Sequence, residues 1–479
     1  MTTAAAEPSH LLHPSVRRVT LSVLTLVGLS AFEGLAVAAA LPQVAASLGD
    51  VALLPWVITA YLLMSGVSTV AAGALADRVG LRTVFRGAVL LFVAGGVLAG
   101  FAPDMKLLVV ARVLQGTGAG AVNAVGLTAV GAVFPQRLVA RAFAANSIVW
   151  GVMSVAGPGL AAVLLSVASW RWIFWMNLPL GGAALLLGWN AMPGPSGEPA
   201  RPLRWSDLIL LTVITGAMLV GVDALDVKTV PALLVAAVCG AYLLRRSRGR
   251  DDVLLAPRHV LARPLGPLAG AMGLLLIGSI GTQSFLPLYV SGARGGGTEL
   301  VAGSVLFFVL GWTSGANTAS RLAPKVGPAT VLRGGTAIVP LALAAVAACA
   351  WLDAPLGAMF LGLFAAGLGM GLGTNTALSE VRDLAPDGEL GRATAAHQFV
   401  RNLGFLLGNA LFGALLLLVV GALTGDVESV RNVLGEGSSL DPDPAIASAI
   451  ATGFATAATV SAAVAALAIL LVPFARPPE

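Results

Sequence analysis

The sequence predicts an all-α, polytopic membrane protein, and three observations lead to this fold class. Apolar residues make up 57% of the 479 residues and charged residues only 11%, where soluble domains carry about 25%. The mean hydropathy is +0.90. The apolar residues gather into runs of about 20, the length of an α-helix that crosses the hydrocarbon core of a bilayer. A water-soluble fold of this length could not cover its surface with so few charges.

The apolar runs are separated by charged or Pro/Gly turns, and they group as six, two and six. The first six lie near residues 17–41, 51–76, 83–101, 106–133, 140–167 and 172–192. The middle two lie near 206–224 and 229–245, and the last six near 265–291, 299–320, 328–352, 355–379, 393–423 and 445–474. We therefore predict fourteen transmembrane helices in four parts: a cytoplasmic tail (1–16), a six-helix bundle (17–192), a linker with two extra helices (193–263) and a second six-helix bundle (264–479).

The distribution of Lys and Arg predicts the orientation in the membrane. With the N-terminus inside, 21 of the 28 Lys and Arg residues fall on the inner side of the predicted spans and five on the outer side, while Arg112 and Arg401 lie within spans. By the positive-inside rule, both termini are cytoplasmic. The strong excess of Arg over Lys, together with abundant Ala and Gly, is typical of a high-GC bacterial genome, so we expect a bacterial inner membrane.

The cysteines and histidines argue against metal and disulfide chemistry. Both cysteines, Cys239 and Cys349, lie within apolar runs, and the four histidines do not have the spacing of a zinc-binding helix. The basic residues are scattered rather than gathered into a patch, which argues against nucleic acid as a partner. No nucleophile and base stand together in a pattern that indicates an enzyme. We expect no metal and no cofactor.

One segment of the chain is repeated. Residues 75–87 (LADRVGLRTVFRG) recur 247 positions later as 322–334 (LAPKVGPATVLRG), with eight of thirteen residues identical. Both segments follow the second span of a six-span block. Two parallel repeats with a substrate site between them, near the middle of the membrane, are a known plan of transporters.

Glu33 is the acidic residue most deeply placed in a predicted span. Burial disfavours the ionised carboxylate, so a proton and a cationic substrate could compete for this group. The alternative is a structural role, with Glu33 neutral or paired with an arginine. Arg112, in the fourth predicted span, must keep its proton and find acceptors, such as carbonyl groups, Gln115 or Glu33. For Arg112, a structural clamp and a proton-coupling partner are equally compatible with the sequence.

Other groups are weaker candidates. The residues Gly157 and Pro158 predict a kink in the fifth span, because proline removes a backbone hydrogen bond. Six polar or aromatic residues form the expected substrate cavity, although amides often serve only to hold helices together: Trp56, Tyr61, Asn123, Gln283, Asn375 and Asn402. Trp56 and a tryptophan cluster at 170–175 are also typical of anchors at the membrane interface.

These residues resemble the motifs of the major facilitator superfamily, and within it the fourteen-span drug:proton antiporters. The segment 73–82 is similar to the loop motif between spans two and three, residues 112–116 match the fourth-span motif associated with proton coupling, and 151–159 resemble the antiporter motif of the fifth span. The segment 170–179 is typical of the fourteen-span branch. The resemblance implies a major facilitator fold and a conformational switch that contains Gly73, Asp77, Arg78, Gly80, Arg82, Gly157 and Pro158.

The sequence departs from the family pattern at three places. Leu35 and Ala38 replace a Thr and an Asn that follow the first-span acid, which indicates an unusual way of handling substrate. Ala161-Ala162 stands where the antiporter motif continues as Gly-Gly, so helix contacts there are looser. The second copy of the loop motif has Pro324 at the position of Asp77, which predicts an asymmetric cytoplasmic closing network.

We therefore expect a monomeric exporter of amphipathic drugs or lipophilic cations, driven by the proton-motive force. Glu33 and Arg112 would couple protons to transport, and the partners would be a small-molecule substrate, protons and membrane lipids. An exporter of a native metabolite or lipid is the nearest alternative, because it would use the same fold. A proton symporter, a membrane-embedded enzyme and a scaffold protein fit the residues less well.

Overall fold

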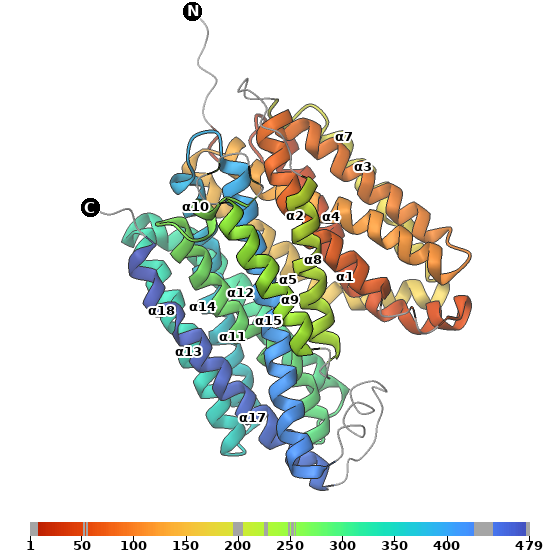
Figure 1. Cartoon of the computed structure of the whole chain (residues 1–479), viewed down its shortest axis with the longest axis vertical. Coiled ribbons are helices and arrows are strands. Elements are labelled where there is room, and N and C mark those ends of the chain that lie inside the picture. The colour runs from red at the N-terminus through yellow and green to blue at the C-terminus, as the bar shows by residue number, and fades with distance from the viewer. Residues whose placement is uncertain are drawn as a thin grey trace, which may run out of the picture. The chain divides into compact units, whose positions relative to one another are not determined.

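The computed structural model of the chain describes residues 8–50, 53, 56–194, 205–224, 229–247, 250, 253, 255–425 and 444–475. The secondary-structure elements in these ranges are all helices (Figure 1). In the first half they are α1 (Arg17–Leu48), α2 (Trp56–Val79), α3 (Leu81–Gly100), α4 (Met105–Val133), α5 (Gln136–Val167), α6 (Arg171–Trp175), α7 (Asn177–Gly188), α8 (Trp205–Ala224) and α9 (Thr229–Ser247). After the short α10 (Pro257–Val260) come α11 (Leu265–Leu288), α12 (Thr298–Val326), α13 (Pro328–Trp351), α14 (Leu356–Leu384), α15 (Leu390–Thr424), α17 (Pro444–Ala466) and α18 (Ala468–Leu471).

A helix overlaps each of the fourteen predicted apolar ranges. Within the described residues, nine helical segments are long and apolar enough to cross a membrane by length and composition. The predicted all-helical, polytopic class is therefore confirmed, whereas fourteen spans remain a prediction. The sixth predicted span is divided at Met176 into α6 and α7, a division that the hydropathy of the run does not indicate.

The chain packs into two compact units. Unit 1 contains residues Met1–Leu219, Ala232–Leu261 and Leu378–Phe399, and unit 2 contains Val220–Pro231, Ala262–Ala377 and Val400–Glu479. The end of α14, the start of α15 and the turn between them thus belong to unit 1, although they come late in the sequence. The predicted division into a tail, two bundles and a linker places this segment in the second bundle, and that division remains a prediction.

Small residues let the helices of unit 1 approach closely. Helix α4 packs against α2 and α3, and a Cβ atom added to Gly116 of α4 would lie only 2.8 Å from the Cα atom of Tyr61 on α2. Glycines at helix contacts are expected in membranes, where close backbone packing replaces the hydrophobic drive of water. Asp104 caps the start of α4, since its Oδ1 accepts a hydrogen bond from the backbone N–H of Leu107 at 2.8 Å.

The two copies of the repeated segment share an unusual backbone conformation. Gly80, between α2 and α3, has φ +87° and ψ 146°, and Gly327, between α12 and α13, has φ +84° and ψ 146°. A residue with a side chain is strained at such positive φ values, so glycine is required at both turns. The match supports the internal repeat that the sequence predicts.

One expectation about the tryptophans is wrong. Trp170 is 2% exposed, and its indole N–H donates a hydrogen bond to Ser47 Oγ at 2.8 Å. Its neighbour Trp172 is 48% exposed, as an interfacial anchor would be. Trp170 therefore packs inside unit 1, where its hydrogen bond to Ser47 ties the residue before α6 to the end of α1.

Candidate functional site

The candidate site lies inside unit 1, where α1, α4 and α7 bring together the groups around Glu33. The Glu33 side chain is fully buried, and Arg112 of α4 is 1% exposed. The Nη1 atom of Arg112 donates a hydrogen bond to Oε1 of Glu33, so the two charges form a buried ion pair. The structure thus has the arginine-paired carboxylate that the sequence suggests as one of two alternatives.

Arg112 is held by more than its carboxylate partner. Its Nε donates to the backbone carbonyl of Val57 at 2.8 Å, and its Nη1 also donates to Oε1 of Gln115 at 2.7 Å. The guanidinium carbon lies 4.1 Å from the ring centre of Tyr61, a cation–π contact. This set of acceptors fixes the plane of the guanidinium, which a lysine could not reproduce.

Asn177 provides a second hydrogen bond to the carboxylate. Its Nδ2 donates to Oε2 of Glu33 at 2.7 Å, and its side chain is fully buried at the start of α7. Helix α3 makes room for this side chain, because a Cβ atom on Gly96 would lie 2.7 Å from Nδ2 of Asn177. Helices α3 and α7 lie side by side in unit 1 (Figure 1).

Each carboxylate oxygen therefore has a donor on a different helix. Ionised Glu33 satisfies both donors, whereas a protonated carboxyl would lose the charge that neutralises Arg112. Oδ1 of Asn177 and Nε2 of Gln115 are buried and have no hydrogen-bond partner. A buried polar atom without a partner is costly, so these two atoms can bind a water molecule or a polar group when the site opens.

Sequence reasoning identified Glu33, Arg112 and Gln115 but missed Asn177. The sequence does contain a sign of Asn177: it is an amide that lies five residues into the sixth predicted span, within the segment 170–179 that is typical of the fourteen-span branch. An amide so close to the start of an apolar run has the sequence pattern of a residue at the membrane boundary. The turn between α6 and α7 instead directs it toward α1.

A second cluster in unit 1 contains Asp77, near the end of α2. Its Oδ1 accepts a hydrogen bond from the backbone N–H of Gly391 at 2.9 Å, and its Oδ2 accepts one from the N–H of Arg392 at 2.9 Å. These N–H groups belong to the first turn of α15. A carboxylate is stabilised there by the unpaired N–H groups and the positive end of the helix dipole.

The other residues of the predicted switch occupy different surroundings. Gly73 lies one turn before Asp77 and packs against the start of α15, where a Cβ atom would come 3.2 Å from the carbonyl carbon of Gly391. Arg82 instead donates from Nε to the carbonyl of Met192, four residues beyond the end of α7, at 2.9 Å. Arg78 is half-buried at the end of α2, and Gly80 forms the turn described above.

Gly157 and Pro158 lie within α5, which runs as one helix from Gln136 to Val167. Gly157 is buried, and the side chain of Pro158 lies outside the described residues. The kink expected at these residues remains a prediction.

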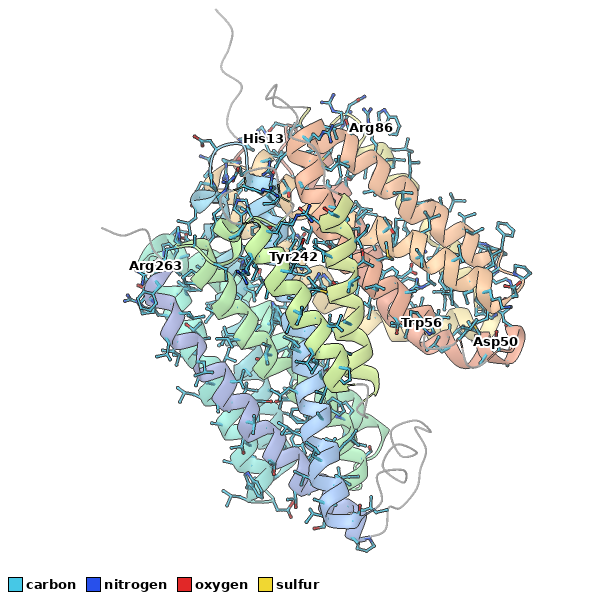
Figure 2. The ribbon with its side chains drawn as sticks, viewed as in Figure 1. His13, Asp50, Trp56, Arg86, Tyr242 and Arg263 are labelled. Carbon is cyan, nitrogen blue, oxygen red and sulfur yellow. The ribbon has the colours of Figure 1, made fainter. Side chains whose placement is uncertain are left out.

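The six expected cavity residues divide between the two units. Tyr61 packs on Arg112 in the site itself, and Asn123 is half-buried on α4. Trp56 is 42% exposed, and Figure 2 shows it with Asp50 at the end of unit 1 opposite His13 and Arg86. The other three belong to unit 2: Gln283 on α11, Asn375 on α14 and Asn402 on α15. Asn375 is buried and donates from Nδ2 to the carbonyl of Ala316 at 3.0 Å, a contact between neighbouring helices.

A comparison with protein families places this chain. The family model of the Major Facilitator Superfamily matches residues 23–409. An uncharacterised MFS-type transporter of Mycobacterium tuberculosis is 28% identical over 423 residues, which are 86% of this chain and 61% of that protein. The chain thus spans about three-fifths of the length of that relative.

Two further relatives carry multidrug names. The multidrug transporter protein MdtP of Bacillus subtilis is 26% identical over 83% of this chain and 74% of its own length. The putative multidrug resistance protein MdtD of Cronobacter sakazakii is 35% identical over 49% of this chain and 52% of its own length.

Solved structures show the same fold at low sequence identity. The human organic anion transporter MFSD10 superposes with a TM-score of 0.66 at 15% identity, covering 96% of this chain and all of that chain. The proton:xylose symporter XylE superposes with a TM-score of 0.61 at 13% identity, covering 96% and 95% of the two chains.

Proposed function

The chain belongs to the Major Facilitator Superfamily, a family of transporters rather than enzymes, and we propose that it is a proton-coupled exporter of amphipathic small molecules. The observation that carries this proposal is the buried ion pair of Glu33 and Arg112, completed by Asn177. A charge that is buried in a membrane-spanning bundle is expensive, and such residues commonly mark proton pathways.

The proposed cycle uses competition for one carboxylate. A proton that reaches Glu33 from outside neutralises it, frees Arg112 and releases a bound substrate. Loss of that proton toward the cytoplasm restores the ion pair and the affinity for substrate. Because Glu33 is fully buried in this conformation, the helices around it must separate before either a proton or a substrate can reach it.

The residues of the site and the names of two relatives support the proposed substrate class. The site offers aromatic, amide and carboxylate groups, which suit amphipathic and cationic molecules. The multidrug names of MdtP and MdtD support the same class. We place both termini in the cytoplasm, because Lys and Arg concentrate on one side of the fourteen spans that the apolar runs predict. The Arg-rich, Ala- and Gly-rich composition supports a bacterial inner membrane.

This orientation assigns a role to the second cluster. Asp77 and the start of α15 then lie at the cytoplasmic end of unit 1, where they hold residues 378–399 in place. We interpret these contacts as a closed cytoplasmic side. Opening toward the cytoplasm requires that Asp77 release the N–H groups of Gly391 and Arg392.

The test is transport by Glu33→Gln in liposomes with an imposed pH gradient and a panel of lipophilic cations, neutral drugs and lipids. We expect gradient-driven accumulation to disappear while exchange of substrate across the membrane, without a gradient, persists. Asp353→Asn is the matched control, because the Asp353 side chain is 84% exposed, and it should transport normally. Full gradient-driven efflux by Glu33→Gln would refute proton coupling at this residue. Equal loss of exchange and of driven transport would assign Glu33 a structural role.

A further inference from the structure

The short helix α10 carries two basic residues that contact a single glutamate far along the chain. Arg258 donates from Nε to Oε2 of Glu389 at 3.0 Å and from Nη2 to Oε1, so it binds the carboxylate in a bidentate manner. The Nε2 atom of His259 lies 2.9 Å from the same Oε2. His259 is 1% exposed and Glu389 7%. All three residues belong to unit 1.

Glu389 immediately precedes α15, whose first turn is bound by Asp77. Nη1 of Arg392 lies 3.9 Å from Oε1 of Glu389, and Nε of Arg392 lies 3.8 Å from Oδ2 of Asp77. The start of α15 is therefore held at two points. Asp77 binds the backbone N–H groups of the first turn of α15. Arg258 and His259 of α10 bind the carboxylate of Glu389, the residue just before that turn.

We propose that Arg258 and His259 are positioning residues that lock the start of α15 onto unit 1 while the cytoplasmic side is closed. The proposal rests on the orientation and the opening step of the proposed function. The contact is well suited to this role because α10 lies in the connection before α11, so it joins the start of α15 to a segment outside the repeated helices. None of the motifs found in the sequence includes α10.

The buried histidine makes this lock sensitive to pH. Burial lowers the pKa of His259 below its ordinary value of 6.5, and the positive charges of Arg258 and Arg392 act in the same direction, against the opposing effect of Glu389. Its Nδ1 is buried and has no hydrogen-bond partner. The neutral ring, with Nε2–H donating to Glu389, therefore fits this site.

The sign of the effect follows from linkage. A histidine whose pKa is lowered in the closed state and ordinary in the open state stabilises the closed state above pH 6.5, and that stabilisation is lost as the pH falls below 6.5. Glu389 remains ionised over this range. Burial alone would raise the pKa of Glu389, but hydrogen bonds from Arg258 and His259, together with the positive charge of Arg258, lower it below its ordinary 4.5. Acidification near neutrality thus loosens the lock through His259.

The test measures opening directly, without substrate or a proton gradient. A cysteine at Thr394, which is 4% exposed on α15, is placed in a full-length chain that has Cys239→Ser and Cys349→Ser. The rate of its alkylation in lipid nanodiscs is divided by the rate for Ser9→Cys, at an exposed position, which corrects for the general increase of thiol reactivity with pH. The ratio is measured from about pH 7.5 to about pH 5.5, on either side of the ordinary histidine pKa.

Two substitutions separate the contact from its titration. His259→Ala removes the hydrogen bond to Glu389, and we expect the ratio to rise about tenfold at the higher pH, as for a lost hydrogen bond to a charged group. His259→Gln retains a donor but cannot titrate in this range, so its ratio should stay low at the higher pH and should rise less than that of the intact chain as the pH falls. Any remaining rise comes from Asp77, whose carboxylate holds the same turn of α15. With His259 intact, the ratio should rise as the pH falls. His10→Gln, at an exposed histidine, should keep that dependence.

The proposal is overturned if His259→Ala leaves the ratio unchanged, or if His259→Gln keeps the whole pH dependence of the chain with His259 intact. Either result stands whether or not Glu33 couples protons, because alkylation requires no transport. Conversely, if Glu33→Gln keeps full gradient-driven efflux, proton coupling at Glu33 is refuted, but the conclusions from alkylation do not change.

Discussion

Single residues decide the chemistry of the buried site, and Arg112 has the most contacts there. It contacts Glu33, Gln115, the carbonyl of Val57 and the ring of Tyr61. Removing one partner of a buried ion pair is costly because the remaining charge has no counterpart, whereas removing both charges can cost little. This asymmetry distinguishes a true pair from two independent residues.

We predict that Arg112→Gln lowers the free energy of unfolding by about 3–5 kcal/mol. Adding Glu33→Gln to that variant should recover most of the loss, because no unpaired charge remains. Thermal unfolding of the purified protein in detergent measures both effects. Lys106→Gln on the same helix is the control, since Lys106 is exposed, and its effect should stay within about 0.5 kcal/mol. Additive losses in the double variant would show that the two residues are not coupled.

At the scale of the element, glycines determine how near α7 can bring Asn177 to Glu33. Gly96 and Gly100 lie one turn apart on α3, and they make room for Asn177 and for the indole of Trp175 respectively. Alanine is the better helix former by about 1 kcal/mol. A glycine at these positions is therefore explained by the close approach of α6 and α7 and not by helix formation.

Gly96→Ala should destabilise the protein by about 1–3 kcal/mol, as overpacking does, and it should reduce efflux by displacing Asn177. Gly87→Ala is the matched control on the same helix, because a Cβ atom at Gly87 meets nothing within 4 Å. That variant should be neutral or slightly more stable. Thermal unfolding and liposome efflux, measured in parallel, test the pair. Equal behaviour of the two variants would contradict the proposed contact.

At the scale of the whole molecule, the contacts of Asp77 connect segments that are more than 300 residues apart in sequence. Residues 378–399 pack in unit 1, while the helices that they begin or end continue in unit 2. Any movement of these helices must therefore break or keep the contact with Asp77. The second copy of the repeat has Pro324 at this position, which cannot accept such hydrogen bonds.

We expect Asp77→Asn to raise alkylation of Thr394→Cys about threefold or more, because it removes the charge that the start of α15 stabilises. Efflux should fall, since the closed cytoplasmic side would be less populated. The matched control is Asp104→Asn, because Asp104 also binds a helix N-terminus but only that of its own helix, and asparagine caps equally well. An unchanged alkylation rate for Asp77→Asn would contradict the closing role.

Much of this molecule could be predicted because its strongest signals are local. The apolar runs predict the positions of the helices, and the repeated segment predicts two equivalent turns, at Gly80 and Gly327. Glu33 could be identified because an acid inside an apolar run is conspicuous. The tryptophan cluster is also a local signal, and it gives a wrong prediction for Trp170. Tryptophans near the end of a span indicate the membrane interface, but tertiary packing buries Trp170.

The sequence by itself determined the all-helical membrane class, the duplicated loop and the acid with its arginine, because hydropathy and charge act over one helix at a time. Only the tertiary structure decided that Asn177 completes the carboxylate site, that Asp77 binds the start of α15 and that α10 holds Glu389. Each of these contacts joins different helices. For Asn177 and Asp77 the contact also depends on glycines, Gly96 and Gly73, that let two helices approach closely. The hydrophobic periodicity of a single segment does not indicate which helix will lie against it.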